Sequence, residues 1–370
     1  MAKENIGPTF LRVDIPTYKK YIQYSIDHDT NMLLEGRPGI GKTEIAKALA
    51  TVKGRKIHIL HPANYDYGDL ATKIPSHSVN PDVWKMVEVF DCSLPSEPNS
   101  ILILDDFTHG DKGVTRQFYR LIQEGKLGSS YELPPNTTII AIYNPTDDVE
   151  AEELEGPLID RFRIRIALES SKDEVISYFE TGEGSTRPYS SYVASFLRFK
   201  PDLLTLQNEE KGNRYELTPR RWDYLTLEGA KIGADNMPEF RFMAMGVLPY
   251  SVGLQFDEFV KKIEIFQGDI TRFVDGSSSF PEELEDQYAV MAAVVGHLNS
   301  DVKYEPLIDK VLDMKMKDAN EEIKALIVFQ SLRTYKKRKG VANLNALMTG
   351  GKREKILAVL RKFDYVVDAL

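Results

Sequence analysis

The sequence predicts an α/β protein in which a parallel sheet flanked by helices is followed by an all-helical region. Between residues 31 and 168, short apolar runs of strand length alternate with stretches of helical periodicity. This alternation is typical of a parallel sheet wrapped by helices. After about residue 170 the periodicity is helical only, so the second half of the chain is expected to consist of helices.

The first expected elements are an extended stretch ending at residues 15–17 and a helix over 18–26. The strand candidates are short apolar runs at 31–35, 56–60, 101–105, 138–143 and 162–168. The segments between them are expected to be helix, irregular chain, helix and hairpin, over 43–53, 61–82, 113–124 and 125–135. The hairpin is indicated by glycines and paired prolines that favour turns.

The second half of the chain shows helical patterns separated by loops. They lie at 174–180, 192–199, 221–230, 256–266, 289–298, 323–332 and 356–360. Glycines and serines make residues 268–281 the best linker candidate, and they separate a final helical portion over 282–370.

The most informative segment is Gly36–Thr43, which is a complete G-x-x-x-x-G-K-[ST] phosphate loop. An apolar strand leads in and an amphipathic helix follows, which disfavours the alternative of a chance glycine-rich turn. Backbone N–H groups would face the β- and γ-phosphates, Lys42 would lie across their oxygens, and the Thr43 hydroxyl would ligate Mg²⁺. The expected nucleotide contacts are Gly36, Arg37, Pro38, Gly39, Ile40, Gly41, Lys42, Thr43 and Glu44.

Two carboxylates end the apolar run Ile101–Leu104, which reads as a buried parallel strand. Ligands bind at the carboxyl ends of such strands. Beside a phosphate loop, Asp105 would hold Mg²⁺ through water and Asp106 would polarise the attacking water. A strand that simply ends in an acidic turn is the alternative.

Composition limits the other classes of function. Charged residues make up 28% and hydrophobic residues 42% of the chain, with no uninterrupted apolar stretch of membrane-spanning length. No apolar signal region follows Met1, so a cytoplasmic location is expected. Cys92 is the single cysteine, which excludes intrachain disulfides and cysteine-based metal clusters. His58 and His61 lie in no metal-ligand pattern.

The net charge of −9 is unevenly distributed. Residues 331–370 hold ten lysines and arginines against three acidic residues, so the rest of the chain is strongly acidic. An acidic body disfavours broad nucleic-acid binding. The basic tail could dock on an acidic partner or a neighbouring copy, although a solvated helical face explains it as well.

In the order of its motifs, the chain from about 30 to 260 resembles the AAA+ ATPases and, within them, the MoxR-like group. The similar segments are Gly36–Thr43 (Walker A), Leu102–Asp106 (Walker B), Ile139–Pro145 (sensor 1), Leu158–Phe162 (arginine-finger turn) and Leu217–Trp222 (sensor 2). The hairpin at 125–135 stands where that family has its pre-sensor 1 hairpin. The resemblance implies ATP as the nucleotide, and no Asn-Lys-x-Asp motif for guanine is present.

The resemblance assigns roles to three further residues. Asn144 would hydrogen-bond the attacking water or γ-phosphate, because an amide offers donors and an acceptor without charge; an Asn-Pro turn is the alternative. Arg161 would be the arginine finger, with a solvated strand face shared with its neighbours as the alternative. Arg220 would reach the phosphates from the lid, and Arg221 is its rival if the register is shifted by one.

A finger acting on a neighbouring chain implies a closed homo-oligomeric ring, most often a hexamer in this class. The resemblance further implies a chaperone-like role in remodelling a client, for MoxR-like ATPases often a protein with a von Willebrand factor A domain. A nucleic-acid motor or loader and a weakly hydrolysing, nucleotide-switched scaffold stay open as alternatives. The family usually has glutamate where this chain has Asp106, and the shorter side chain predicts a slow ATPase.

Three domains are therefore expected. Residues 1–170 would form the AAA+ nucleotide-binding α/β domain with a leader helix, 171–267 a helical lid with sensor 2, and 268–370 a C-terminal helical extension with the basic tail.

Overall fold

The structure is a computed structural model that describes most of the chain. The described residues are 10–66, 69–77, 84–109, 112–144, 154, 156–180, 183–208, 215–275, 279, 281–298, 304–313 and 321–361. The chain divides into two compact units, Met1–Ser171 and Lys172–Leu370.

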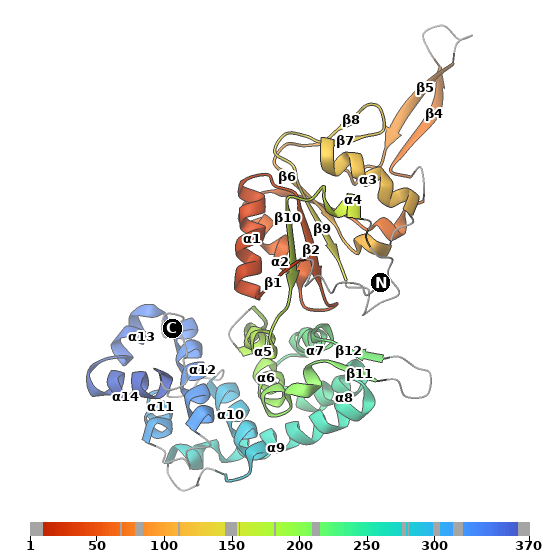
Figure 1. The fold of residues 1–370 in the computed structure, drawn as a ribbon. Coiled ribbons are helices and arrows are strands. Elements are labelled where there is room, and N and C mark those ends of the chain that lie inside the picture. Colours follow the sequence, from red (N-terminus) through yellow and green to blue (C-terminus); the bar gives the residue numbers. More distant parts are fainter. Residues whose placement is uncertain are drawn as a thin grey trace, which may run out of the picture. The chain divides into compact units, whose positions relative to one another are not determined.

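The first unit is built on a six-stranded parallel sheet (Figure 1). In spatial order its strands are β1 (Leu11–Val13), β10 (Ile164–Leu168), β2 (Met32–Gly36), β9 (Thr138–Tyr143), β6 (Ser100–Leu104) and β3 (Lys56–Leu60). Strands β6 and β9 are buried along their whole length, as expected of central strands covered on both faces. The predicted α/β class is confirmed.

Helices cover both faces of this sheet. Alternate strand residues, among them Met32 and Ile103, pack with α1 (Ile15–Asp27) and α2 (Lys42–Val52) on one face. The intervening residues, among them Leu33 and Leu102, pack with α3 (Lys112–Glu124) on the other. Because strand side chains alternate between faces, each apolar run contributes to both cores. The result is a three-layer α/β/α unit (Figure 1).

Helix α1 begins earlier than the sequence pattern indicated. It starts at Ile15 and not near residue 18, with the Asp14 carboxylate accepting the Thr17 N–H at 2.8 Å as the N-terminal cap. Pro16 lies in the first turn, where a missing N–H costs nothing because that group has no partner within the helix. The extended stretch before it is the edge strand β1, which pairs with β10.

Two hairpins extend this unit. The predicted hairpin at 125–135 is present as β7 (Lys126–Leu127) and β8 (Tyr131–Glu132). The expectation of an irregular stretch over 61–82 is wrong in part, because β4 (Ala71–His77) pairs with β5 (Trp84–Phe90) in an antiparallel ribbon. Its described side chains are mostly exposed, and the apolar residues of β5 are not confined to one face of the strand.

One carboxylate joins the two hairpins. Oε2 of Glu88 accepts hydrogen bonds from the backbone N–H and the hydroxyl of both Ser129 and Ser130, at 2.8–2.9 Å. These donors lower the pKa of Glu88 to about 2. The ring of Phe90 also lies 5.3 Å from that of Tyr131.

The second unit consists mainly of helices, as expected. They are α5 (Lys172–Glu180), α6 (Ser190–Phe199), α7 (Pro219–Ile232), α8 (Met237–Val247), α9 (Tyr250–Asp275), α10 (Leu284–Leu298), α11 (Tyr304–Asp313), α12 (Glu321–Lys339), α13 (Val341–Leu347) and α14 (Gly350–Arg361). One small antiparallel pair interrupts them, β11 (Leu206–Asn208) with β12 (Tyr215–Leu217), which corrects the expectation of helices alone. Strands of three residues are too short to leave a periodic pattern.

Two cores hold this unit together. The first contains Trp222, Phe196 and Phe256 and lies among the helices from α5 to α10. The second lies among α10 to α14, and α10 contributes to both. The linker expected from residue 268 is wrong in its first part, because α9 continues to Asp275, while residues 276–278 lie outside the described part. The division of this unit into lid and extension stays a prediction.

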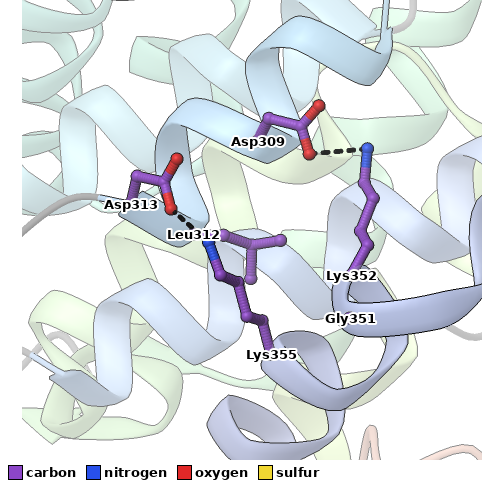
Figure 2. A pocket seen from close by; sticks show the side chains of 6 residues that line it. All are labelled: Asp309, Leu312, Asp313, Gly351, Lys352 and Lys355. Atoms are coloured by element: carbon purple, nitrogen blue, oxygen red, sulfur yellow. Dashed lines mark hydrogen bonds and ion pairs between the residues drawn. The ribbon is translucent and has the colours of Figure 1, made fainter.

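Part of the basic tail is neutralised within the same unit. Lys352 and Lys355 of α14 pair with Asp309 and Asp313 of α11, at 2.6 and 2.8 Å, along a pocket of about 260 Å³ (Figure 2). Nearby, the buried Lys324 donates to the carbonyl of Leu312 at 2.7 Å, and burial lowers its pKa. These contacts support the structural interpretation of two tail lysines, whereas residues 362–370 lie outside the described part.

Candidate functional site

The phosphate loop connects β2 to α2 and is shaped by its glycines. Gly39 and Gly41 have φ values of 77° and 87°, in the left-handed region that favours glycine. At Gly36, a Cβ would lie 3.0–3.2 Å from the Lys42 side chain, the Ile40 side chain and the Leu168 carbonyl. The loop is therefore curled tightly at the amino end of α2, where backbone N–H groups are available to an anion.

Lys42 is the most buried charged group of this loop. Its side chain lies at the first position of α2, and the residue is only 6% exposed. Its Nζ donates to the carbonyl oxygens of Gly36 and Arg37, the latter at 2.9 Å, and to Oδ1 of Asn144 at 2.8 Å. The ammonium is thus held inside the curl, among acceptors that a phosphate oxygen could replace.

The two carboxylates stand at the carboxyl end of β6, beside the loop. Oδ1 of the half-buried Asp105 accepts the Thr43 hydroxyl at 2.8 Å. Asp106 is exposed, with a φ of 51°. The left-handed region is uncommon for a residue with a side chain, and aspartate tolerates it better than most. The backbone therefore changes direction at Asp106, the residue after Asp105 and its contact with Thr43.

Asn144 bridges the loop and the carboxylates. It follows β9, the strand between β2 and β6, and is 9% exposed. Its Oδ1 accepts from Lys42, and its Nδ2 donates to Oδ1 of Asp106 at 3.3 Å. The amide orientation satisfies both neighbours. Three adjacent strands thus bring five predicted site residues to one edge of the sheet: Lys42, Thr43, Asp105, Asp106 and Asn144.

The donor set fits Mg²⁺ with a nucleotide. A hydroxyl and a carboxylate in contact are oxygen ligands, which Mg²⁺ prefers, and it usually takes only one or two of them from the protein besides phosphates and water. Within the described residues, no group of three or more His, Cys, Asp or Glu side chains could hold a metal by itself. A site completed by nucleotide phosphates matches this sparse donor set.

Comparison with known proteins agrees with this geometry. Residues 31–162 match the family model described as an AAA domain of the dynein-related subfamily. The chain carries an AAA domain. The match covers the sheet from β2 to β9 and all five residues gathered at its edge, so the predicted AAA+ resemblance is confirmed at the level of the domain.

Whole-chain likenesses to solved structures are loose. The RuvB Holliday junction branch migration motor of Thermotoga maritima is 17% identical, with 84% of this chain and 95% of that chain covered and a TM-score of 0.40. NtrX from Brucella abortus in complex with ADP is 10% identical, with 94% and 68% covered and a TM-score of 0.38. No curated protein matches the chain in sequence.

The AAA domain also contains Arg161, the predicted finger. It follows α4 (Gly156–Ile159), a single helical turn, and its side chain is half-buried. The guanidinium donates to the carbonyl of Pro157 and lies over the ring of Tyr119, 4.9 Å from the ring centre. Arg161 is not among the residues gathered around Lys42, and its role as an arginine finger stays a prediction.

Arg220 and its rival Arg221 lie in the second unit. Both are exposed on the first turn of α7, which begins at Pro219 after Thr218. Trp222 beside them is fully buried, so the register of this turn points both arginines to solvent. The phosphate contact of Arg220 stays a prediction, and so does the role of Asn144, Asp106 and the loop residues in chemistry.

Two contacts of the first unit were not predicted from the sequence. The fully buried Tyr18 of α1 donates its hydroxyl to the Lys42 carbonyl at 3.1 Å, and burial, with the charge of Asp105 as a second cause, raises its pKa well above the usual value. Tyr143 donates to Oε2 of Glu35 at 2.6 Å, and burial raises its pKa too. Helical and strand periodicity place both phenols in the core, without any signal for their hydroxyl partners.

Among the helices of the described residues, none has both the length and the apolar character needed to cross a membrane.

Proposed function

We propose that this protein is a MoxR-like AAA+ ATPase that hydrolyses ATP with Mg²⁺ and works as a cytoplasmic homo-oligomeric ring. One observation carries the proposal most directly. The Lys42–Asn144–Asp106 chain of hydrogen bonds and the Thr43–Asp105 contact bring together a cation, a metal-type oxygen pair, an amide and an exposed carboxylate at one sheet edge. These are the parts that phosphoryl transfer to water requires.

Binding comes first in the proposed mechanism. The N–H groups at the start of α2 and the Lys42 ammonium would receive the β- and γ-phosphates, in place of the carbonyl and amide acceptors that now hold Nζ. Thr43 and Asp105 would hold Mg²⁺, Asp105 through water. The metal supplies neutralisation of the charge on the phosphate oxygens.

Orientation of the attacking water is assigned to Asp106 and Asn144. Asp106 is exposed and accepts a hydrogen bond from Asn144 Nδ2, which leaves lone pairs of the carboxylate for a water molecule. A carboxylate there can accept a proton from water, and the amide can hold either the water or the γ-phosphate in line. Asn144 would therefore report the presence of the γ-phosphate to both Lys42 and Asp106.

Arg161 would complete the site of a neighbouring copy. An arginine finger stabilises charge that develops on the phosphoryl oxygens, typically by ~10³–10⁵ in rate. If each chain supplies Arg161 to its neighbour, every site is complete only when the chains form a closed oligomer. A hexameric ring is the form that the resemblance implies. Arg220 would add a contact from the lid.

The task of the ring follows from the MoxR-like resemblance. We propose that loss of the γ-phosphate changes the position of the lid and remodels a client protein, for which a partner with a von Willebrand factor A domain is the first candidate. Within this proposal nucleic acid is not the client, because the chain outside its basic tail is acidic.

The test is ATP turnover measured against protein concentration. Three samples are compared: the native chain, Arg161→Ala, and an equimolar mixture of Arg161→Ala with Lys42→Ala. We expect specific activity to rise with concentration, to fall by about 10³-fold in Arg161→Ala, and to return in part in the mixture. Arg163→Ala is the matched control, since Arg163 is exposed two residues away.

Two outcomes would contradict the proposal. Turnover that is independent of concentration and untouched by Arg161→Ala would show a self-contained site. Full activity after removal of Mg²⁺ by a chelator would show that the Thr43–Asp105 pair does not hold a required metal.

A further inference from the structure

The turn that carries Arg161 is anchored in the core of the AAA domain. Phe162, the next residue, is 2% exposed, and its ring meets that of Phe107 edge to face, at 6.4 Å between ring centres. Phe107 in turn lies 5.8 Å from Phe118 of α3. This buried aromatic chain fixes the backbone at Arg161 relative to α3, so the side chain starts from a defined point.

The guanidinium itself rests on an aromatic face from the same helix. Tyr119 follows Phe118 on α3, and the Arg161 guanidinium carbon lies 4.9 Å from the centre of its ring. One Nη group donates to the carbonyl of Pro157, while the buried Nε has no hydrogen-bond partner among the described residues. Within 6 Å of a ring centre, the negative π-face attracts a cation.

The nature of these contacts matters for what Arg161 can do. A carboxylate partner would neutralise the guanidinium, whereas a ring face and a carbonyl hold it and leave its charge for a phosphate. Arg165 shows the contrast, since it pairs with Asp160 at 3.1 Å. No such ion pair is found for Arg161 in the part of the chain that the structure describes.

We propose that Tyr119 is a positioning residue, whose ring face holds the Arg161 guanidinium ready for the nucleotide bound by a second copy of this chain. The inference rests on the proposed function, in which Arg161 acts on a neighbour. Arginine has many rotamers, and a contact that restricts them before assembly reduces the entropy lost when the finger enters the neighbouring site.

The test separates the chain that gives the finger from the chain that uses it. The donor carries Lys42→Ala, so its own site is inactive but its Arg161 is intact. The acceptor carries Arg161→Ala, so its site depends on the donor. Turnover of an equimolar mixture then reports how well the donor presents Arg161.

Tyr119→Leu is placed first in the donor and then, in a second mixture, in the acceptor. In the donor we expect it to lower the restored turnover about tenfold, because a loosely held catalytic group loses its productive geometry. In the acceptor it should leave turnover within about twofold. Tyr119→Phe in the donor keeps the ring face, so this donor should restore as much turnover as the donor with an unaltered Tyr119.

Each result has a definite meaning. A donor with Tyr119→Leu that restores turnover as well as the unaltered donor overturns the proposal. Equal losses in donor and acceptor also overturn it, because they indicate a general structural role. Loss with Tyr119→Phe as large as with Tyr119→Leu would assign the effect to the hydroxyl and overturn the role of the ring. No restoration in the reference mixture overturns the proposed shared site, and this inference with it.

Discussion

The Nζ of Lys42 lies 2.8 Å from Oδ1 of Asn144, so the phosphate loop and the end of strand β9 are joined by one hydrogen bond. The same amide donates from Nδ2 to Asp106. In the proposed mechanism, a phosphate that takes the place of Asn144 on Lys42 would change the hydrogen bonding of an amide that also contacts Asp106. Binding and hydrolysis would then meet at this side chain.

Asn144→Asp should separate binding from turnover. The new oxygen would still accept from Lys42 but would face the Asp106 carboxylate where Nδ2 now donates, so two like charges would meet. We expect turnover to fall by about 10²-fold and ATP affinity to change less than tenfold. Asn99→Asp is the control, because Asn99 accepts from Asn136 at 3.0 Å through an oxygen that aspartate retains. Equal losses of affinity and turnover would contradict this role for Asn144.

Asp106→Glu should not make the enzyme faster. The backbone at residue 106 has a φ of 51°, which aspartate tolerates better than glutamate, and its short carboxylate already contacts Asn144. We expect no gain in turnover and a melting temperature lower by a few degrees. A several-fold rise in turnover would show that side-chain length, and not backbone conformation, limits this position. Measuring both properties on one preparation distinguishes the two causes.

Tyr18→Phe should weaken the support of the phosphate loop. It removes the hydroxyl that donates to the Lys42 carbonyl and leaves the buried ring in place. Loss of one such hydrogen bond costs about 1 kcal/mol, which corresponds to a fall of about 2–4 °C in Tm for a unit of this size. ATP should raise the Tm of both proteins, since a ligand that binds the folded state stabilises it. Tyr21→Phe on the same helix is the control, and an equal effect there would contradict the prediction.

The Glu88 contact should depend on pH in a defined window. Hydrogen bonds from Ser129, and then Ser130, lower the pKa of Glu88 from 4.5 to about 2. A folded-state pKa below the unfolded value gives stability that is present above about pH 4.5 and is lost as the pH falls toward 2. The Tm difference between the native chain and Glu88→Gln should therefore shrink below pH 4.5.

The control for this series is Glu132→Gln. Glu132 is exposed, and its Oε1 lies 4.0 Å from Nζ of Lys126. Removing the charge of this weakly paired carboxylate should change Tm little at any pH. A Glu88→Gln effect that stayed constant from pH 7 to pH 3 would show that the carboxylate charge is not what joins the two hairpins.

The sequence predicted the central sheet because its inner strands are buried on both faces. Apolar runs such as Ile101–Leu104, alternating with stretches of helical periodicity, favour parallel strands, and the observed bounds of the predicted strands differ from the expected ones by at most two residues. The β4–β5 ribbon escaped prediction because, among the described residues, its strands pair with each other alone and remain exposed, with Ile74 47% accessible. Strand β5 does contain apolar residues, but exposed ones such as Met86 and Val87 fall on opposite faces of the strand, so they form no alternating pattern.

For the candidate site, motifs predicted which residues the fold would gather but not what supports them. Lys42, Asp105 and Asn144 follow strands of one sheet, and parallel topology alone brings strand ends together. Tyr18 and Tyr119 could not be predicted in this way, because each contacts a residue from a different part of the fold, Lys42 and Arg161 respectively. Their spacing indicates only a helix face, and the partner of a phenol or a ring depends on packing that no local pattern encodes.

The contact between Phe107 and Phe162 has a consequence for timing. Phe107 directly follows Asp106, and Phe162 directly follows Arg161. In the proposed ring these two functional residues would serve different nucleotides, one held by the chain itself and one held by its neighbour. A change at the first nucleotide could then alter the position of Arg161 through the contact between these two phenylalanine side chains, and so change the rate of hydrolysis at the second nucleotide. In such an assembly, the packing of these two phenylalanines would offer a route inside each subunit by which hydrolysis at one site influences the next.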